Sequence, residues 1–365
     1  MILQTQELQE SCKTILYAIS SESLNTITDM VQIDSQNGTM EMSISNTDYF
    51  VRVAVPVSSD EELHATVLAK VFLSLISKTD KDEIELTVSD SALIVKGNGV
   101  YEIPLVTDDN GDIFQIPEIV INHVENTGYI RGDVLTSIYA HNTKQFDLGV
   151  ISKPVQRMYY IDTEGCITFT TGACVNKFEF PTTRKLLLNQ KLVKLFKLFG
   201  KEEVTVTVGQ DSVGSIQQNK VKFENDYITI TAITNSDVDM IGSVPATAIR
   251  NRAWGEYDHN CVVDTKQFTN AISRLLLFNT NNILMVGTFE FSSECLTVSK
   301  GKNHEPIKYA EFDFMDTYKC DIDLVELYGV LSACDSQLVT ISFGDGQAIV
   351  IKGNHTSNVV PEVVG

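Results

Sequence analysis

Internal repetition is the feature of this chain that most restricts its fold. Three segments each begin with a short apolar strand, continue through a polar turn able to cap a helix, and end in apolar residues at helical spacing. These segments start with Ile2–Leu8, Tyr129–Leu135 and Val262–Phe268. The turn residues Thr5, Arg131 and Asp264 lie 126 and 133 residues apart, so the chain is predicted to contain three successive units of similar length.

A second helix is predicted about halfway through each unit, and an alternating strand follows it at once. The helices are expected at Glu62–Lys78, Arg184–Phe199 and Ile322–Ala333, and the strands at Glu83–Val88, Val204–Val208 and Leu338–Phe343. Further strands are expected at Ala92–Gly97 and Ala348–Gly353, and Asn37-Gly38 and Asp345-Gly346 are typical of tight hairpin turns. Helices packed on one face of an antiparallel sheet make each unit an α+β domain.

The predicted domains span residues 1–124, 125–256 and 257–365, and each is expected to carry two helices on antiparallel sheet. The joins fall in polar, irregular stretches near His123–Gly128 and Asn251–Asn260. Neither stretch is a long Gly/Ser linker, so we expect the domains to be held rigidly.

The stretch Arg184–Lys201 differs in charge from the rest of the chain. The whole chain has 28 basic and 48 acidic residues, a formal charge of −20, whereas this stretch has several cations and no carboxylate. As an α-helix it would place Leu188, Leu192, Leu195, Phe196 and Phe199 on one side, and Lys191, Lys194, Lys197 and Lys201 on the other. Both a solvated lysine-rich face and a basic binding surface fit this pattern.

Several functional classes find no support in the sequence. The seven cysteines are an odd number, widely scattered and without a CxxC pair, which predicts reduced, buried thiols and neither a disulfide framework nor a zinc site. No apolar run approaches the roughly 20 residues that cross a bilayer, and no basic signal-peptide region is read at the N-terminus. The six histidines have no metal-ligand spacing, and no P-loop, GxGxxG or GxSxG motif is present. We therefore expect no enzyme, no metal and no cofactor.

Three motifs resemble one known family, the bacterial-type sliding clamp that serves the replicative DNA polymerase. The third unit opens with Val262-Val263-Asp264 followed by Ala271–Leu276, the middle unit has Leu148-Gly149-Val150 leading to Phe169–Gly172, and the chain closes with Val359-Val360-Pro361. The chain also departs from the family: Thr171 stands where an Asp is usual, Ala173-Cys174 replaces a bulkier, basic pair, and Glu362 stands where an apolar residue is common. These departures suggest a divergent clamp, and a phage or mobile element is its expected origin.

The resemblance implies a head-to-tail homodimer in which two three-domain chains close a ring around double-stranded DNA, with helices inside and a continuous sheet outside. A sliding ring has to contact phosphates rather than bases, since base contacts would hold it at particular sequences. The DNA-facing residues are expected to be Lys191, Lys194 and Lys197, with Lys13, Lys70, Lys144 and Arg274 as further candidates. The third unit's second helix begins with Asp321, Asp323 and Glu326, so we expect little basic lining from it.

The resemblance also implies an apolar pocket between the second and third domains for a peptide from the replicative polymerase or the clamp loader. Its expected lining is Thr170, Gly172, Val175, Pro245, Ile249, Ala348, Val360 and Pro361. Val360 and Pro361 are taken to follow the last strand, and Glu362 to add charge at the rim. The dimer seam is expected to use Leu277 and Phe278 from one chain, and Tyr101 and Ile103 on an edge strand of the other.

The main alternative is a non-enzymatic membrane-surface or structural protein built from the same repeat, because a basic amphipathic helix can lie on anionic lipid. The other predicted helices lack such a basic face, which favours the clamp. A two-domain trimeric clamp is disfavoured because three units are counted. The resemblance places the protein in the cytoplasm near the nucleoid, or in a host cytoplasm for a phage protein, without a membrane partner.

Overall fold

The structure is a computed structural model that describes residues 1–19, 29–57, 60–147, 151–278, 285–334, 336–344 and 346–363. The chain forms two compact units. Unit 1 comprises Met1–Asp133, Pro181–Thr183 and Lys194–Asn235, and unit 2 comprises Val134–Phe180, Arg184–Val193 and Ser236–Gly365. The expected second domain, residues 125–256, contributes to both units, so the division into three domains stays a prediction.

Unit 1 contains two antiparallel sheets and a layer of helices. Its strands are β1 (Ile2–Gln4), β2 (Met30–Gln36), β3 (Thr39–Ser45), β4 (Tyr49–Pro56), β5 (Leu63–Leu68), β6 (Glu83–Val88), β7 (Ala92–Lys96), β8 (Val100–Pro104), β9 (Val124–Arg131), β14 (Glu203–Val213), β15 (Ile216–Glu224) and β16 (Ile228–Thr234). Its helices are α1 (Thr5–Ala18), α2 (Ala69–Ser77) and the 3₁₀ helix η4 (Leu195–Phe199). The strand orders are β5-β2-β3-β4-β16-β15-β14-β9 and β1-β6-β7-β8.

Unit 2 has the same kind of architecture. Its strands are β10 (Tyr159–Asp162), β11 (Gly165–Phe169), β12 (Ala173–Lys177), β13 (Leu186–Leu188), β17 (His259–Asp264), β18 (Val286–Phe291), β19 (Leu296–Lys300), β20 (Asn303–Ile307), β21 (Tyr309–Phe312), β22 (Tyr318–Asp323), β23 (Leu338–Phe343), β24 (Ala348–Lys352) and β25 (Thr356–Pro361). Its sheets have the orders β13-β10-β11-β12-β25-β24-β23-β17-β21 and β20-β19-β18-β22.

The helical segments that begin after β9 complete the chain. They are α3 (Gly132–Ser137), the π-helix η2 (Ile138–Asn142), α4 (Lys144–Asp147), the 3₁₀ helix η3 (Pro154–Arg157), α5 (Gln190–Lys194), α6 (Val238–Gly242), α7 (Ala246–Trp254), α8 (Thr265–Leu276) and α9 (Leu324–Ala333). Along the described chain, the order strand, helix, four strands, helix, three strands occurs three times, with β21, η3, α6 and α7 as additions. The α+β class with recurring helices and antiparallel strands is therefore confirmed.

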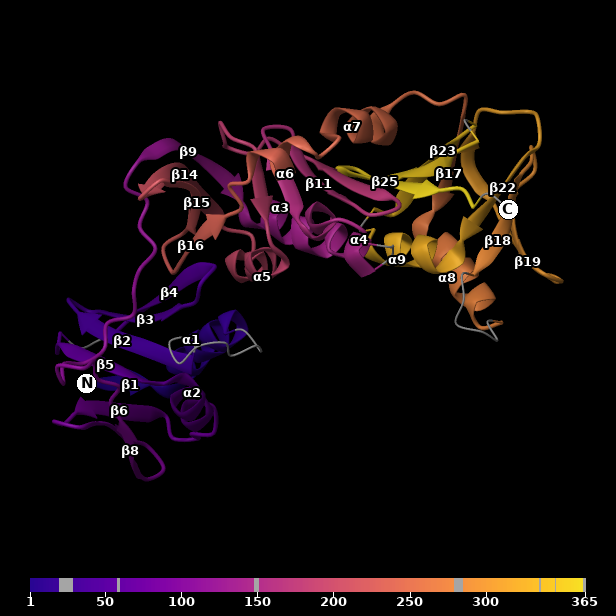
Figure 1. The fold of residues 1–365 in the computed structure, drawn as a ribbon. Helices are drawn as coiled ribbons and strands as arrows, with labels where there is room; N and C mark the ends of the chain where they lie inside the picture. Colours follow the sequence, from indigo (N-terminus) through magenta and orange to yellow (C-terminus); the bar gives the residue numbers. More distant parts are fainter. Residues whose placement is uncertain are drawn as a thin grey trace. The chain divides into compact units, whose positions relative to one another are not determined.

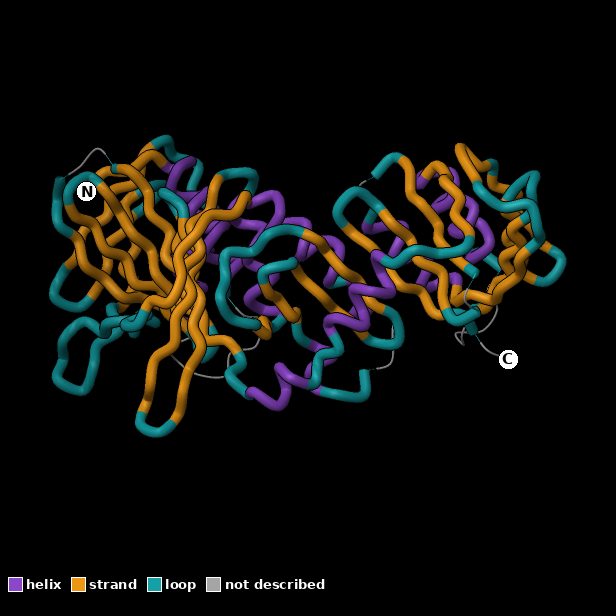
Figure 2. Tube along the Cα trace, turned by 90° about the horizontal axis from the view of Figure 1, so that it is seen from above, coloured by secondary structure: helices purple, strands orange, loops and turns teal. Residues whose placement is uncertain are grey.

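Within each unit the helices of this repeat lie against one face of the sheets, as the ribbon and tube views show (Figures 1 and 2). In unit 1, α1 packs on β3 and β4, and α2 packs on β2 and β5. In unit 2, α8 packs on β17, β19 and β20, and α9 packs on β22 and β25. The added helix α7 lies on the opposite face of the nine-stranded sheet from α4 and α9 (Figure 1).

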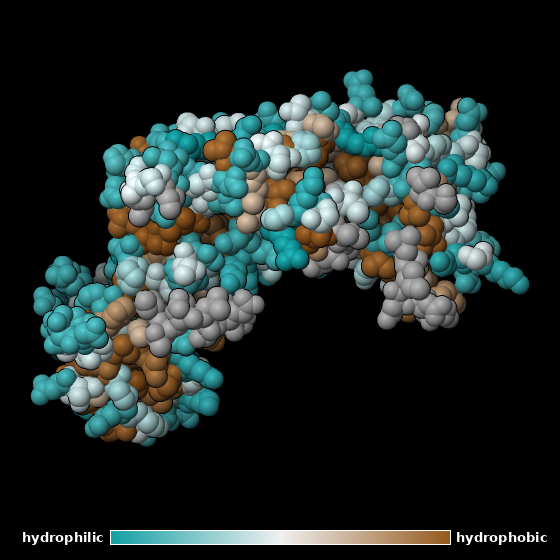
Figure 3. All heavy atoms as spheres, in the orientation of Figure 1, coloured by the Kyte–Doolittle hydropathy of each residue, from teal (hydrophilic) through white to brown (hydrophobic). Residues whose placement is uncertain are grey.

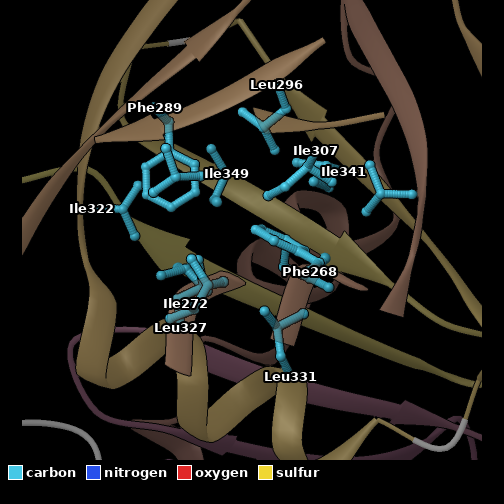
Figure 4. Packing of buried hydrophobic residues seen from close by; sticks show 14 of the residues in the cluster. Phe268, Ile272, Phe289, Leu296, Ile307, Ile322, Leu327, Leu331, Ile341 and Ile349 are labelled. Carbon is cyan, nitrogen blue, oxygen red and sulfur yellow. The ribbon is translucent and has the colours of Figure 1, made fainter. Parts of the chain in front are cut away.

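Apolar side chains from both sheets of unit 2 meet beneath α8 and α9. Phe268 and Ile272 of α8 and Leu327 of α9 point toward Phe289 and Ile341 of the strands (Figure 4). All five side chains are buried. Removing this area from water is the main stabilising contribution, of order 1.5–3 kcal/mol for each large side chain.

A buried ion pair holds the segment that leads into β9. Asp211 of β14 and Lys220 of β15 lie 2.7 Å apart, and Lys220 also donates to the backbone carbonyl of Val120. The backbone N–H groups of Asn122 and His123 donate to the same carboxylate at about 3 Å. These contacts, the one to Lys220 first, hold the pKa of Asp211 well below its usual range. The join near His123–Gly128 is thus ordered, and most of it is strand rather than the expected irregular stretch.

The predicted boundaries of the second helices are wrong, each in the same way. The expected helices Glu62–Lys78, Arg184–Phe199 and Ile322–Ala333 each begin with a strand, namely β5, β13 and the end of β22, and the helix starts only afterwards. A continuous apolar run does not reveal where a buried strand becomes a helix. The capping side chains mark where the helix begins. Asn189 and Asp323 accept hydrogen bonds from the backbone N–H groups of Leu192 and Val325, respectively.

The strand and turn predictions agree better with the structure. Strands β6 and β23 have the predicted bounds, and Asn37 and Gly38 adopt the positive φ angles, 52° and 75°, of a tight hairpin turn. The motif Leu148-Gly149-Val150 and the turn residue Asp345 lie outside the described residues. Helix α7 is not among the predicted helices, although Ala246, Ile249 and Ala253 have helical spacing; only its last residues, from Asn251 on, overlap the expected join Asn251–Asn260.

Candidate functional site

The basic stretch has the predicted two faces but is not one α-helix. Strand β13 is followed by the five residues of α5 and by the 3₁₀ helix η4. Its apolar residues Leu188, Leu192, Leu195, Phe196 and Phe199 are all buried. Lys194 and Lys197 are exposed and Lys191 is half-buried; these three are called the basic-segment lysines.

The membrane-surface alternative loses its basis in this geometry. Phe196 and Phe199 of η4 pack against Phe223 of β15, with ring centroids 4.9 and 6.4 Å apart. An interfacial helix must insert its apolar face into lipid. Here that face is part of the protein core, so only the lysines are presented to a partner.

Two elements of unit 1 bring cations together. The ammonium of Lys194 lies 4.8 Å from the centre of the Tyr17 ring on α1, a cation–π contact. Lys13 is exposed and precedes Tyr17 by four residues, so the two side chains lie on one face of α1. Lys13 and Lys194 therefore flank Tyr17. This grouping supports a phosphate-binding surface built from α1 and the basic stretch.

The other candidate cations differ in exposure and in ion pairing, and therefore in how well they could bind a phosphate. Lys70 on α2 and Lys144 on α4 are exposed. Arg274 on α8 makes a bidentate pair with Glu305 of β20 at 2.7 and 2.8 Å, so its charge is already neutralised. Helix α9 has no cation, as expected from its acidic start, and its Glu326 is buried.

The expected partner pocket is only partly assembled. Val175 of β12 and Ile249 of α7 belong to one apolar cluster on the α7 side of the sheet. Val360 is wrong as a lining residue, because it lies inside β25 and belongs to the core beneath α8 and α9. Side chains alternate across a strand, so its neighbour Val359 is the one that faces the α7 cluster.

The remaining expected lining residues are not members of that apolar cluster. Pro361 pairs with the buried Ala348 across β25 and β24. Pro245 is exposed at the start of α7. Glu362 accepts a hydrogen bond of 2.7 Å from the Tyr318 hydroxyl, so it is not a free charge at a rim. A truncation from Val359 onward would remove half of β25 rather than a loose tail.

Thr170 and Gly172 belong to a buried polar group at the end of β11. The Gln145 amide donates to the Thr170 hydroxyl at 2.8 Å. A Cβ on Gly172 would lie 2.5 Å from the Val359 carbonyl oxygen and 2.6 Å from the Glu326 carboxylate, so only glycine fits. Burial, followed by the nearby Asp323 carboxylate, raises the pKa of Glu326 to about 7, against an opposing hydrogen bond from Gln145.

Helix α7 is docked on the face of the nine-stranded sheet opposite α4 and α9 (Figure 1). The Arg250 guanidinium binds both oxygens of Asp162 at 2.9 and 2.5 Å. The Ser357 hydroxyl donates to the carbonyl of Ala253, and Lys352 donates to that of Gly255. Helix α7 thus carries two of the expected pocket residues, Pro245 at its N-cap and Ile249 within it, while its last residues lie in the expected join Asn251–Asn260.

A pocket of about 740 Å³ remains open beside α7. Its lining residues are Thr163, Glu164, Val175, Lys177, Phe178, Glu179, Arg250, Asn251, Trp254 and Gly255. Lys177 lies 5.7 Å from the Trp254 ring centre, so aromatic and charged groups share this pocket. Sequence reasoning identifies only Val175 among these residues; the chain's single tryptophan beside Arg250 is the available signal.

The seam residues are largely on the surface. Leu277 and Phe278, which follow α8, are 80% and 56% exposed, and Tyr101 of β8 is 41% exposed. Ile103 is only 2% exposed and packs within its own chain, so it does not present a surface to a partner. The view in Figure 3 shows apolar residues exposed around α2, β6 and β8 of unit 1.

The described residues contain no group of three or more histidine, cysteine or carboxylate side chains placed to hold a metal ion. Their cysteines are free thiols, most of them buried, and burial raises the pKa of Cys12 to about 12. No described helix has the length and hydropathy of a bilayer span. The features that remain are the basic helices, the α7 pocket and the exposed strand edges.

No protein-family model matches the sequence, and no curated protein matches it significantly. Solved structures do match over the whole chain. The β subunit of DNA polymerase III from Pseudomonas aeruginosa is similar with a TM-score of 0.78 at 13% identity, covering 100% of this chain and 99% of that one. The DNA polymerase sliding clamp of Bacillus subtilis gives 0.78 at 15% identity, covering 100% and 98%.

A putative DNA polymerase III β subunit from Eubacterium rectale is similar to the same degree, with a TM-score of 0.78 at 12% identity and coverage of 99% and 98%. Identities this low carry no information about individual site residues, but full coverage at these scores fixes the architecture. The chain therefore has the fold of the bacterial DNA polymerase sliding clamps.

Proposed function

We propose that this protein is a sliding clamp, a non-enzymatic processivity factor that encircles duplex DNA as a ring of two chains and tethers a replicative polymerase. In this proposal residues 1–124, 125–256 and 257–365 are its three domains. The fold supports this proposal, since its structural neighbours are named as DNA polymerase sliding clamps and β subunits. The protein would act in the cytoplasm on DNA, placed there by a clamp loader.

One observation carries the proposal: the same strand pairing recurs twice inside the chain. Counting eight strands in each repeat, β21 aside, the fourth strand of one repeat pairs with the eighth strand of the next. This happens between β4 and β16 in unit 1, and between β12 and β25 in unit 2. The fourth strand of the last repeat, β20, and the eighth strand of the first, β8, each pair on one side only within the described chain.

A second copy would satisfy both edges in the same way. Its β8 would pair with β20 of the first copy, and its β20 with β8 of the first. Such head-to-tail contacts close a ring where the rotation per copy allows it and extend a filament otherwise. Pairing would also cover two edges that are otherwise open to nonspecific strand addition.

The charge distribution supports DNA as the ligand of the surface formed by α1 and the basic stretch. The basic-segment lysines and Lys13 lie on a chain whose net charge is −20, so duplex DNA would be repelled from most of the surface. Attraction through phosphates is independent of sequence and sensitive to salt, as sliding requires. The α7 pocket is the proposed site for a short polymerase or loader peptide with an apolar anchor beside Trp254.

The test combines assembly and topology. Sedimentation of the purified chain should give a dimer. Loaded onto nicked circular DNA with a clamp loader, the protein should stay bound at moderate salt and leave once the circle is linearised, because a ring slides off a free end. Equal loss from circular and linear DNA, or a monomer at all accessible concentrations, would contradict the proposal.

A further inference from the structure

The two internal pairings predict the register of the seam between copies. In unit 1, Phe50 of β4 lies opposite Thr231 of β16. In unit 2, Ala173 of β12 lies opposite Val359 of β25. The corresponding residues of β20 and β8 can be found by counting along the sheets, because each repeat has the same strand order.

On the fourth strand, the count starts at the residue that precedes the second helix and crosses three strand pairings. In the first repeat Leu68 lies opposite Met30, the β2–β3 register extended two residues beyond Gln32 and Ser43 leads to Ser45, and Ser45 lies opposite Phe50. In the second repeat the β13–β10 and β10–β11 registers, each extended to Met158, lead from Asn189 to Phe169, which lies opposite Ala173. In the third repeat it starts at Asp323, which lies opposite Val286. Extending the β18–β19 register two residues beyond Thr288 and Ser299 leads to Gly301, and extending the β19–β20 register past Lys300 and Asn303 leads to Lys302 in the tight turn.

On the eighth strand, the count starts at the residue that precedes the first helix. Gln4 lies opposite Glu83, Arg131 opposite Glu203, and Asp264 opposite Leu338. Four residues further along the sixth strand of each repeat are Thr207, Ser342 and Thr87. Crossing two strand pairings from these residues leads to Thr231, Val359 and Glu102, respectively. Thr231 and Val359, the two residues used in the internal pairings, therefore correspond to Glu102.

We propose that a second copy of this chain docks its β8 against β20 in the register that sets Lys302 opposite Glu102, once at each of two seams. This inference rests on the proposed ring and adds the residues that define its closure. It also sets His304 opposite Val100. Lys302 and Glu102 are both exposed and have opposite charges, so the register places complementary charges across the seam.

The backbone geometry fits this register. In the internal pairing of unit 1, the Ala54 N–H donates to the Tyr227 carbonyl at 2.8 Å and the Ile233 N–H to that of Asp48 at 3.0 Å. Alternate residues between these positions therefore turn their N–H and C=O groups toward the partner strand. On β8, the Leu105 N–H is directed to Ser91, so Glu102 and Val100 have the opposite, outward orientation.

On β20, the same alternation fixes where the seam ends. The two-residue turn Gly301-Lys302 makes Lys300 and Asn303 a hydrogen-bonded pair, so His304 and Pro306 are directed outward. Pro306 corresponds to Ala54, the N–H donor of the internal pairing, but has no N–H to donate. The seam ladder therefore stops before Pro306 and is shorter than either internal ladder.

Helices repeat the same arrangement next to the strands. In unit 1, α1 contacts η4, and in unit 2, α4 contacts α9. The helices left over are α8 of the last repeat and α2 of the first. Leu277 and Phe278 lie at the end of α8, and Val71 on α2 is 49% exposed, so both sides offer apolar surface to the seam. With few backbone hydrogen bonds available, these side chains and the charge pair determine closure.

Charge reversal tests the register in the full-length chain. K302E places Glu opposite Glu at both seams, and E102K places Lys opposite Lys. Each variant alone should raise the dimer dissociation constant about 10- to 100-fold, since the change occurs twice per ring. An equimolar mixture of the two should recover near-parental affinity. In the mixed dimer one seam joins the two changed residues, Glu at 302 and Lys at 102, and the other seam keeps the parental Lys302 and Glu102, so both seams pair opposite charges. The double variant K302E/E102K, in which every seam pairs Glu with Lys, should recover parental affinity and is the decisive rescue.

The control H304E introduces the same charge two residues away, opposite Val100, and should neither weaken the dimer like K302E nor be rescued by E102K. If E102K rescues H304E instead, the register is shifted by two residues and this inference is wrong. If K302E and E102K have no effect while a variant lacking Leu277 and Phe278 dissociates, the register fails and the ring stands. If the parent itself forms no dimer, the proposed function fails. Analytical ultracentrifugation at low salt distinguishes these outcomes.

Discussion

Replacing Glu326 with Gln should stabilise the protein at neutral and alkaline pH but not in acid. Glu326 is 6% exposed, on α9, and lies near Asp323 and the backbone of Gly172. Burial raises the pKa of its carboxyl from 4.5 to about 7. A shift of this size corresponds to about 3 kcal/mol at 1.36 kcal/mol per pKa unit.

The sign follows from where each state loses its proton. Below pH 4.5 the carboxyl is protonated in both the folded and the unfolded chain, so it contributes nothing to the pH dependence. Between pH 4.5 and about 7 only the unfolded chain releases the proton, and stability falls. Above pH 7 the full penalty of about 3 kcal/mol is present, and Glu326→Gln removes it because the amide is neutral and of similar shape.

Urea denaturation of the parent and of Glu326→Gln at pH 5 and pH 8 measures the effect. The difference in unfolding free energy between the two proteins should be small at pH 5 and approach about 3 kcal/mol at pH 8. Glu256→Gln, an exposed site, is the matched control and should show no such difference. A Glu326→Gln variant that gains nothing between pH 5 and pH 8 would refute the argument from burial.

Three further predictions concern the surface and the joins. Reversing the charge of the three basic-segment lysines to Glu should shorten retention on nicked circular DNA with circular dichroism and sedimentation unchanged, since solvated charges contribute little to stability; unchanged retention would remove them from the DNA-facing surface. Replacing Leu277 and Phe278 with Ala should give monomers in sedimentation, because a short seam depends on a few apolar anchors; a parental profile would place the seam elsewhere. Asp211→Asn should cost about 3 kcal/mol in thermal or urea unfolding by leaving the ammonium of Lys220 buried without its partner, and parental stability would show that this pair does not hold the join.

The repeat in the sequence by itself determined the architecture of this protein. Strand–turn–helix patterns with local caps, such as Asp264 accepting the N–H of Gln267, depend on neighbouring residues and are readable from sequence. The strands after the second helices are predictable for the same reason, since alternation is a local property. The amphipathic division of the basic stretch is also correct, because burial of Phe196 and exposure of Lys197 follow from spacing alone.

Only the tertiary structure decided which apolar run was strand and which was helix, and which face of β25 met which core. Val359 and Val360 are neighbours of the same chemistry, yet one faces α7 and the other the core beneath α8 and α9. Which of the two valines faces the core depends on the register between β25 and β12, two strands that are far apart in the chain. The pairing of Arg274 with Glu305 and the docking of α7 on the nine-stranded sheet through Arg250 and Asp162 were likewise long-range outcomes. Pairing between distant segments, which no local pattern encodes, therefore set the surface that a partner meets.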